Sequence, residues 1–384
     1  GMLHAFRMGK LERQRDDLQP TKLCNSEGDC STDKLGREEW AFIPKNAMPY
    51  LRYTAFPSYS HINTVDLKPY VIQKKGSGKK ILIGGMRFGG GCGADAKTFD
   101  AVHPPSDTCA DRKGSNCTGR SAYFALDVTD PQNPEYMWSF SPPKLGYSFS
   151  GPAYIKRKDT SVNPDQWKHY LMFASGPTSH DGYSDQGLRL FVRELETGDK
   201  VHTFGENNGI HGNAFGGRLF TDGLDVNGDY QTDFVFLGHT QKQSKGTTSG
   251  GGVMKIWTGA TASGEPDPEN WHINKNYLNN SDKSVVSRVI PMQCFGDQWY
   301  LYFGTGRYFY ATDNDMDTNY LYGLPFTCDA QNNCDTGNIN SAHNSETMDC
   351  GDIYMKGTNP NKAGWKRKLK EKSEITGDYM IERN

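Results

Sequence analysis

The stretch Asp225-Val-Asn-Gly-Asp-Tyr-Gln-Thr-Asp233-Phe-Val-Phe-Leu-Gly238 joins an oxygen-rich turn to a short apolar run. Side-chain oxygens recur at its first, third, fifth and ninth positions, which is the ligand spacing of a calcium-binding loop. An EF-hand sets such a loop between two helices, whereas the run Phe234–Gly238 reads as a β-strand. The stretch therefore predicts a metal-binding loop on a β-rich scaffold.

The nine residues Asp225–Asp233, called the acidic loop below, contain five expected ligands. These are the carboxylates of Asp225, Asp229 and Asp233, the amide oxygen of Asn227 and the backbone carbonyl of Gln231. Three carboxylates around a divalent cation leave a net charge of about −1, which favours calcium over a monovalent ion. Tyr230 stands at the sixth position, where the sharp turn usually requires glycine. The alternative is an Asp- and Asn-rich hairpin turn that binds no metal.

An apolar strand ending in glycine recurs along the chain. The four copies are Ile81–Gly84, Tyr170–Gly176, Phe234–Gly238 and Tyr300–Gly304. A second strand follows each copy, at Tyr123–Val128, Leu188–Arg193, Gly252–Trp257 and Asn319–Gly323, and another precedes each, at Pro69–Ile72, Pro152–Ile155, Arg218–Phe220 and Arg288–Ile290. The last three of the following strands are about 65 residues apart, a fixed period typical of stacked supersecondary units.

Four antiparallel strands per repeat predict an all-β fold, a modified β-propeller with four whole blades and a partial one. The whole blades are expected at about residues 64–142, 148–206, 214–278 and 284–368. Residues 1–43 supply the partial blade, and residues 369–384 form a tail or a closing strand. Because residue 1 lies inside an apparent strand, we expect further blades upstream. An open β-solenoid or a pair of sandwiches is the alternative, which the regular period disfavours.

Nine cysteines fall partly into close pairs. The pairs are Cys24 with Cys30, Cys109 with Cys117, and Cys328 with Cys334, whereas Cys92, Cys294 and Cys350 have no local partner. Each pair brackets polar residues, which predicts disulfide-stapled loop insertions and an oxidising compartment. Buried free thiols are the alternative for several of them. Neither CxxC nor CxxCH occurs, so a zinc ribbon, a thioredoxin-type site and a c-type haem are disfavoured.

Charge and motifs narrow the function further. The net charge is −2, so no basic footprint indicates nucleic acid, and no apolar run is long enough to cross a membrane. No grouping typical of hydrolases or metalloproteases occurs in a supporting context, so we predict no catalytic residue and no enzyme. A second acidic cluster, Asp313-Asn-Asp-Met-Asp317, allows a second cation, with a solvated turn as the alternative.

Several motifs occur in an order that resembles a known family. They are Gly1–Phe6, Glu39–Pro44, Tyr123–Pro131, Trp138–Phe140 with Leu145–Phe149, the acidic loop and Phe303–Tyr308. Together they resemble the C-terminal propeller domain of the PilY-type type IV pilus biogenesis and tip-associated adhesins. The resemblance runs from residue 1 to about 325 and thins through Gly364-Trp365 to Ile381–Arg383.

This resemblance implies a non-enzymatic, calcium-binding component of the type IV pilus, placed outside the cell at the pilus tip or the outer membrane. It implies support for pilus biogenesis, for the balance of extension and retraction, and for surface adhesion. The implied partners are minor pilins, the upstream part of the same protein, and host or environmental surface ligands.

Two alternative functions stay open. A quinoprotein-like propeller dehydrogenase is suggested by Glu196-Thr-Gly198 followed by Phe204, which resembles blade motifs of that group. A generic ligand-binding propeller is the other.

Overall fold

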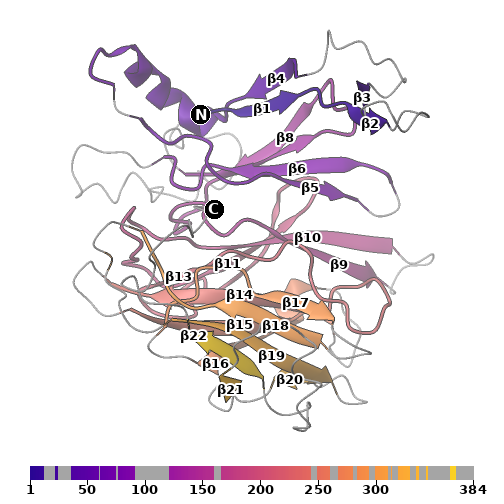
Figure 1. Cartoon of the computed structure of the whole chain (residues 1–384), viewed down its shortest axis with the longest axis vertical. Coiled ribbons are helices and arrows are strands. Elements are labelled where there is room, and N and C mark those ends of the chain that lie inside the picture. The colour runs from indigo at the N-terminus through magenta and orange to yellow at the C-terminus, as the bar shows by residue number, and fades with distance from the viewer. Residues whose placement is uncertain are drawn as a thin grey trace.

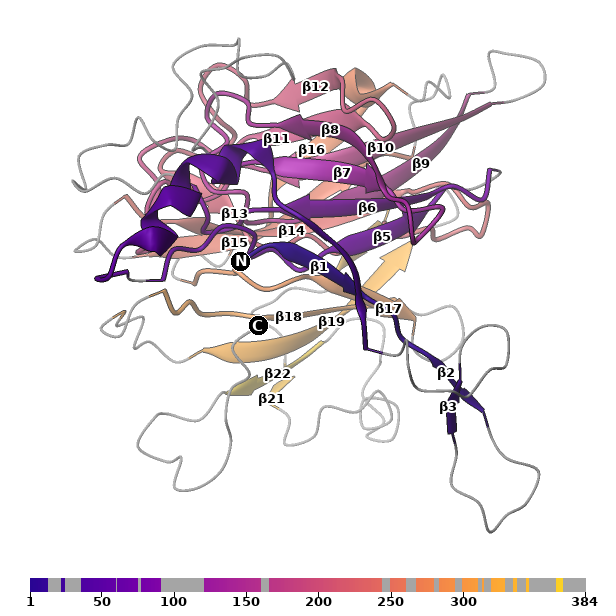
Figure 2. The same ribbon diagram turned by 90° about the horizontal axis from the view of Figure 1, so that it is seen from above.

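The computed structural model describes residues 1–12, 22–24, 36–59, 61–74, 77–90, 121–159, 166–243, 249–259, 267–279, 283–293, 299–309, 313, 319–328, 334–336, 343–344 and 364–368. Strands dominate these residues, and their sheets follow one another from one end of the molecule to the other (Figure 1, Figure 2). The predicted tail at residues 369–384 lies outside the described residues.

Four antiparallel sheets follow the chain in order, and we call them blades 1 to 4. Blade 1 contains β5 (Tyr70–Gln73), β6 (Lys80–Gly85), β7 (Tyr123–Asp127) and β8 (Glu135–Phe140). Blade 2 contains β9 (Ala153–Asp159), β10 (Gln166–Ala174), β11 (Leu190–Glu194) and β12 (Lys200–Phe204). Blade 3 contains β13 (Ala214–Gly216), β14 (Phe234–Gln241), β15 (Gly250–Trp257) and β16 (His272–Asn279).

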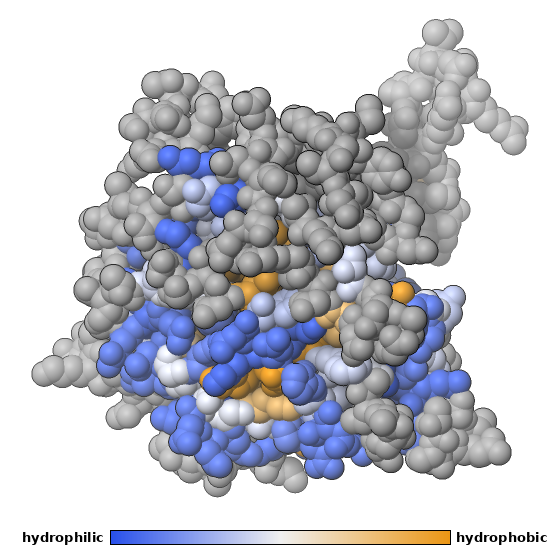
Figure 3. Space-filling view, turned by 90° about the horizontal axis from the view of Figure 1, so that it is seen from below, coloured by the Kyte–Doolittle hydropathy of each residue, from blue (hydrophilic) through white to orange (hydrophobic). Residues whose placement is uncertain are grey.

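Blade 4 is larger than the other three. It contains β17 (Ile290–Gln293), β18 (Trp299–Gly304), β19 (Tyr320–Cys328) and β22 (Trp365–Lys368). Strand β20 (Cys334–Thr336) pairs with β19, and β21 (His343–Asn344) runs parallel to β22. Seen from the blade 4 end, Figure 3 shows hydrophobic residues at the surface with hydrophilic residues around them.

A partial blade precedes blade 1. Strands β1 (Leu3–Phe6) and β4 (Glu38–Phe42) form a two-stranded sheet. In the segment of chain that joins them, β2 (Lys10–Glu12) pairs with β3 (Lys22–Cys24). The 3₁₀ segments are η2 (Lys45–Ala55) and η6 (Pro268–Asn270). No helix of the described residues is both long and apolar enough to span a bilayer. The expected all-β modified propeller, with four whole blades and a partial one, is confirmed.

Two of the expected first strands were placed wrongly. The first strand of blade 3 is Ala214–Gly216, and not Arg218–Phe220. The Arg218 N–H donates to the carbonyl of Val286, and the Leu219 N–H donates to that of Ser150. These residues therefore connect blades rather than extend a sheet. The strand expected at Arg288–Ile290 begins only at Ile290.

Buried side chains join each sheet to the next. In the interface of blades 1 and 2, the Tyr123 ring lies 4.2 Å from that of Phe173 and 5.5 Å from that of Phe140, between ring centroids. Similar apolar clusters join blades 2 and 3, blades 3 and 4, and the partial blade with blade 1. Because the blades are covered on both faces, the inner strands are almost wholly buried, which explains their unbroken apolar runs.

Four phenylalanines, one from each blade or the connection beside it, form a hub. Phe88 follows β6, Phe149 precedes β9, Phe215 lies in β13 and Phe309 follows β18. The Phe309 ring lies 5.8–6.0 Å from the other three, between centroids. Aromatic contacts at this separation stabilise beyond the area they bury. The hub thus ties all four blades together.

A buried ion pair joins blade 4 to a loop of blade 2. The Arg307 Nη2 lies 3.0 Å from Asp313 Oδ2, and the two side chains are 0% and 1% exposed. The same guanidinium donates to the carbonyls of Asp181 and Gly182 in the loop after β10. Asp313 also accepts the Phe309 N–H. The pair is therefore fully hydrogen-bonded, as a buried charge requires.

Few of the cysteines fall within the described residues. Cys24 and Cys334 each take part in a disulfide bond. The strand register places Cys328 directly opposite Cys334. The other six cysteines lie outside the described residues. They are Cys30, Cys109 and Cys117 of the expected pairs, and Cys92, Cys294 and Cys350. The three pairings and the disulfide-stapled insertions stay predictions.

We predict that Asp313→Ala lowers the free energy of unfolding by about 3–5 kcal/mol, because it leaves the Arg307 guanidinium buried without a counter-charge. The matched control is Glu206→Ala, which breaks the exposed ion pair with Lys200 and should cost no more than about 1 kcal/mol. Urea unfolding measures both. A loss for Asp313→Ala as small as that of the control would contradict this role.

Candidate metal centre

The acidic loop lies between β13 and β14, at the edge of blade 3. Its base is closed as a hairpin, because the Leu224 N–H donates to the Phe234 carbonyl at 2.9 Å and the Asp233 N–H to the Leu224 carbonyl at 2.8 Å. The first and last expected ligands, Asp225 and Asp233, therefore lie next to each other at the base of this hairpin. This is the setting that the sequence predicts.

Side-chain oxygens at alternate positions accept hydrogen bonds from the loop's own backbone. Asp225 accepts the N–H groups of Gly228 and Tyr230 through its two oxygens, both at 2.7 Å. Asn227 accepts the Asp229 N–H at 2.9 Å in the same way. Such local bonds fix a tight turn without help from a regular ladder.

The remaining two carboxylates are held in the same manner. Asp229 Oδ1 accepts the Gln231 N–H at 2.8 Å, and Asp229 Oδ2 accepts the Gln231 side-chain amide at 2.9 Å. Asp233 Oδ2 accepts the Val226 N–H at 2.9 Å. All four expected side-chain ligands thus keep their positions through bonds to the loop backbone.

Asp233 is the buried member of the set, at 7% exposure. Burial, together with the nearby carboxylates of Asp229 and Asp225, raises the pKa of its carboxyl to about 6, against the lowering effects of the Val226 N–H and of Arg157. The three carboxylates therefore repel one another, which destabilises the loop when all are ionised. A cation would relieve that repulsion.

Two backbone conformations explain the tight turn. Gly228 has φ +78° and Tyr230 has φ +67°, so both lie in the left-handed region. The left-handed region is easy for Gly but costs other residues about 1–2 kcal/mol. The sixth position of the loop does turn as the calcium pattern requires, and Tyr230 adopts that turn without the usual glycine. The residue is 63% exposed.

The acidic loop also contacts blade 2. The Thr232 N–H donates to the Lys156 carbonyl at 2.9 Å, and the Lys156 N–H donates back to Thr232 Oγ1 at 3.2 Å. The Lys158 N–H donates to the side-chain oxygen of Gln231 at 2.9 Å. Strand β9 of blade 2 is thus hydrogen-bonded to the acidic loop of blade 3.

Arg157 supplies a positive charge behind the loop. Its guanidinium donates to the carbonyls of Thr232, at 3.2 Å, and of Gly259, at 3.0 Å. Burial lowers the pKa of Arg157, while the carboxylates of Asp233 and Asp229 oppose that effect. Sequence reasoning did not find Arg157, because nothing in the β9 run Ala153–Asp159 links it to a loop in the next blade.

The donor set fits a hard divalent cation in its chemistry, since every expected ligand is an oxygen. Asp225, Asn227, Asp229 and Asp233 are brought into one turn, together with the carbonyl of Gln231. Their oxygens are engaged by backbone N–H groups, and no three His, Cys, Asp or Glu side chains of the described part are grouped as closely as bound metal ligands. Calcium at this loop stays a prediction.

The second acidic cluster has a different role at the one position that is described. Asp313 is the buried partner of Arg307 and is neither solvated nor free to bind a cation. Residues 314–318, which include Asp315 and Asp317, lie outside the described residues.

The motif Glu196-Thr-Gly198 serves to join blades. The Glu196 carboxylate binds the ammonium groups of Lys74 and Lys79 in the turn of blade 1. Gly198, with φ +70°, lies directly under the Trp138 ring, where a Cβ would come within 2.6 Å of it. In this structure the motif therefore packs blade 2 against blade 1.

Comparison with known proteins supports the resemblance stated above. No model of a known protein family matches the chain. The chain is 25% identical over 323 residues to a protein from Xylella fastidiosa (strain Temecula1 / ATCC 700964) named "Type IV pilus biogenesis factor PilY1 homolog". The match covers 76% of this chain but only 18% of that relative, so the chain spans a small part of the relative's length.

The crystal structure of the Pseudomonas aeruginosa PilY1 C-terminal domain superposes with a TM-score of 0.51 and 15% identity, over 97% of this chain and 71% of that one. This likeness shows a shared fold. The crystal structure of xylan β-1,4-xylosidase from Bacillus halodurans C-125 gives a TM-score of only 0.29, which supports no conclusion. The resemblance to the PilY-type C-terminal domain is confirmed.

We predict that Tyr230→Gly raises the free energy of unfolding by up to about 1 kcal/mol relative to Tyr230→Ala, because only glycine adopts a positive φ without strain. Both variants remove the ring, so the difference between them isolates the backbone term. Urea unfolding measures the two side by side. A Gly variant less stable than the Ala variant would contradict the left-handed conformation at this position.

Proposed function

We propose that the chain is the non-enzymatic, calcium-binding C-terminal domain of a type IV pilus biogenesis factor. The observation that carries the pilus assignment is the sequence match over 323 residues to the PilY1 homolog. The shared propeller fold supports it. The calcium assignment depends on the acidic loop, in which oxygen ligands at the required spacing are fixed within one turn.

Calcium would be held by the carboxylates of Asp225, Asp229 and Asp233, the Asn227 amide oxygen and the Gln231 carbonyl. The ion supplies positive charge at the point where three carboxylates repel one another. The protein's own part is to fix these oxygens by backbone hydrogen bonds and to keep Arg157 behind them as a permanent counter-charge.

The position of the loop gives the ion a mechanical role. Thr232 bonds to β9 of blade 2, and the Thr258 N–H at the end of β15 donates to the Asp233 carbonyl at 2.8 Å. The loop is thus bound to two strands of different blades. Charge neutralisation would tighten both attachments, and calcium loss would loosen the rim where they meet. We propose that this switch influences the balance of pilus extension and retraction.

The proposed setting is outside the cell, after export through an oxidising compartment, at the pilus tip or the outer membrane. The proposed partners are minor pilins and the rest of the same polypeptide, with adhesion to host or environmental surfaces as a further role. The sequence match to a pilus biogenesis factor supports this setting. The cysteine pairs expected from the sequence agree with it.

We predict that calcium at about one hundred times its dissociation constant stabilises the wild-type chain by about 2.7 kcal/mol. Asp225→Asn should abolish this gain, because the amide keeps an acceptor for the Tyr230 N–H but lacks the charge. Thermal unfolding with calcium and with chelator measures the difference.

The matched control is Asp130→Asn, in a turn where Asp130 accepts the Gln132 N–H at 2.9 Å without a cluster of carboxylates. That variant should keep the full calcium response. An equal melting temperature of the wild type in calcium and in chelator would refute calcium binding at this loop.

For the pilus assignment, we predict that replacing the gene's codon for Asp225 with one for Asn in the producing bacterium changes surface piliation or twitching, while the Asp130→Asn strain behaves as wild type. Sheared surface pilin and twitching zones measure the effect. A deletion strain with normal pili would exclude a role in pilus biogenesis, whatever the result for calcium.

A further inference from the structure

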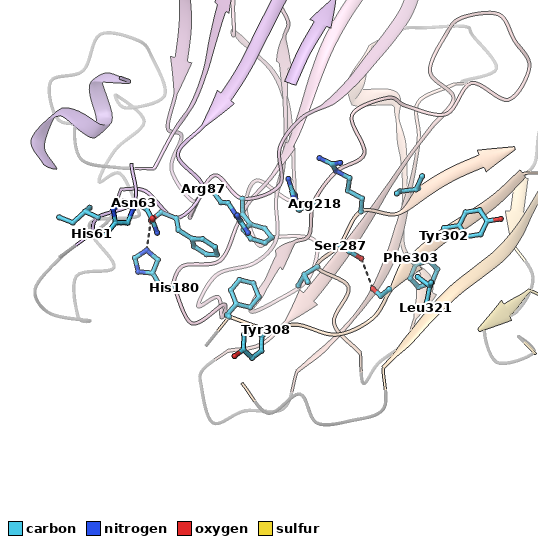
Figure 4. A pocket seen from close by; sticks show the side chains of 18 residues that line it. His61, Asn63, Arg87, His180, Arg218, Ser287, Tyr302, Phe303, Tyr308 and Leu321 are labelled. Atoms are coloured by element: carbon cyan, nitrogen blue, oxygen red, sulfur yellow. Dashed lines mark hydrogen bonds between the residues drawn. The ribbon is translucent and has the colours of Figure 1, made fainter. Parts of the chain in front are cut away.

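A cavity of about 890 Å³ lies beside the phenylalanine hub, between blade 1 and blade 4 (Figure 4). Phe88, Phe149 and Phe309 of the hub form part of its wall, together with Tyr302 and Tyr308. The Tyr308 side chain is 69% exposed. The cavity therefore has an aromatic wall that is open to solvent at Tyr308, and none of the residues Asp225–Asp233 lines it.

Three arginines from different blades line this cavity. Arg87 follows β6, Arg218 follows β13 and Arg288 precedes β17. The same three line an adjoining cavity of about 490 Å³, so they form the boundary between the two. Figure 4 shows Arg87 and Arg218 next to each other at the cavity.

The described residues neutralise these arginines only in part. Asp66 Oδ2 lies 3.8 Å from Arg87 Nη1, a separation beyond a hydrogen bond. Arg288 donates to the Tyr70 hydroxyl, which is uncharged. Among the described residues, nothing accepts a hydrogen bond from the Arg218 guanidinium. The three arginines and the one carboxylate in ion-pair distance of them together carry a charge of about +2.

The Nε atoms of the three arginines also lack hydrogen-bond partners among the described residues. The Nε atoms of Arg87, Arg218 and Arg288 are buried and make no hydrogen bond with the described residues. A buried donor without an acceptor is destabilising. Sites that bind oxyanions use the planar guanidinium, which offers several donors in a fixed fork. Among the described residues, the outer guanidinium nitrogens of the three arginines hydrogen-bond only to the Tyr70 hydroxyl, and an oxyanion would satisfy donors of this kind.

The backbone conformation and the burial of Arg87 are both energetically unfavourable. Its backbone has φ +50°, a left-handed conformation that is uncommon for a residue with a long side chain. Burial lowers the pKa of its guanidinium, and the charge of Arg218 lowers it too, against the effect of Asp66. Strain of this kind persists mainly where function requires a side chain in one place. Here it places the guanidinium 5.1 Å from the Phe88 ring centroid and 5.5 Å from that of Phe149.

We propose that the arginines Arg87, Arg218 and Arg288 bind a doubly charged oxyanion, either a phosphate monoester or a pair of carboxylates, whose attached ring or apolar body lies on the aromatic wall of the cavity. The net charge at the boundary matches two negative charges. The aromatic wall matches a ligand that is apolar next to its anionic group. This site is independent of calcium and goes beyond the proposed pilus function.

The test is isothermal titration of the full chain, in saturating calcium, with phenyl phosphate and with phthalate. Saturable binding of at least one probe is expected, and the tighter of the two identifies the phosphate or the paired-carboxylate form of the ligand. Inorganic phosphate should bind more weakly than phenyl phosphate. Equal affinities of these two would overturn the part assigned to the aromatic wall.

Arg218→Gln should weaken the tighter probe by about tenfold or more, because it removes charge-assisted hydrogen bonds. Arg218→Lys keeps the positive charge but lacks the forked donors of the guanidinium. Its affinity for the probe should lie between those of Arg218→Gln and the wild type. The control, Arg37→Gln, changes an exposed arginine outside the cavity and should bind as wild type. Circular dichroism and the melting temperature verify that each variant is folded. The absence of saturable binding to the wild type, or equal binding by a folded Arg218→Gln, would overturn the proposal.

Discussion

Repulsion among three carboxylates in one turn, at the junction of two blades, is the physical constraint on which this account depends. The turn cannot relax by opening, because a hairpin bond at Leu224 closes its base and Thr232 binds it to the neighbouring blade. It cannot fully neutralise itself either, since Arg157 is its only described cationic partner and Asp233 is buried. A loop with this charge and this geometry is suited to respond to a cation, and both blades are attached to it.

The cavities beside the phenylalanine hub carry the opposite charge. Around the hub of phenylalanines, arginines from three blades face two adjoining cavities, and Asp66 is the one carboxylate among the described residues that forms an ion pair with them. Acidic groups thus gather at the edge of blade 3, and basic groups gather where blades 1, 3 and 4 meet. Both clusters lie on connections between strands and not within them, and stacked blades hold those connections in place.

Sequence patterns predicted the features that depend on residues close together in the chain. Recurrent apolar runs ending in glycine identified the blades, since inner strands are buried on both faces, and ligand spacing identified the turn that Tyr230 completes at positive φ. Long-range partners were not predictable in this way. Arg218 was taken for part of a strand because Leu219 and Phe220 follow it, and the ion pair of Asp313 with Arg307 depends on burial that no spacing reveals.

The central claim is that calcium in the acidic loop fastens blade 2 to blade 3, and hydrogen–deuterium exchange of backbone amides tests it most directly. The account predicts that calcium slows exchange within the loop, at Tyr230 and Thr232, and in addition at Lys156 of β9, whose amide donates to Thr232. Protection that is confined to the loop, or exchange that calcium does not alter, would contradict it.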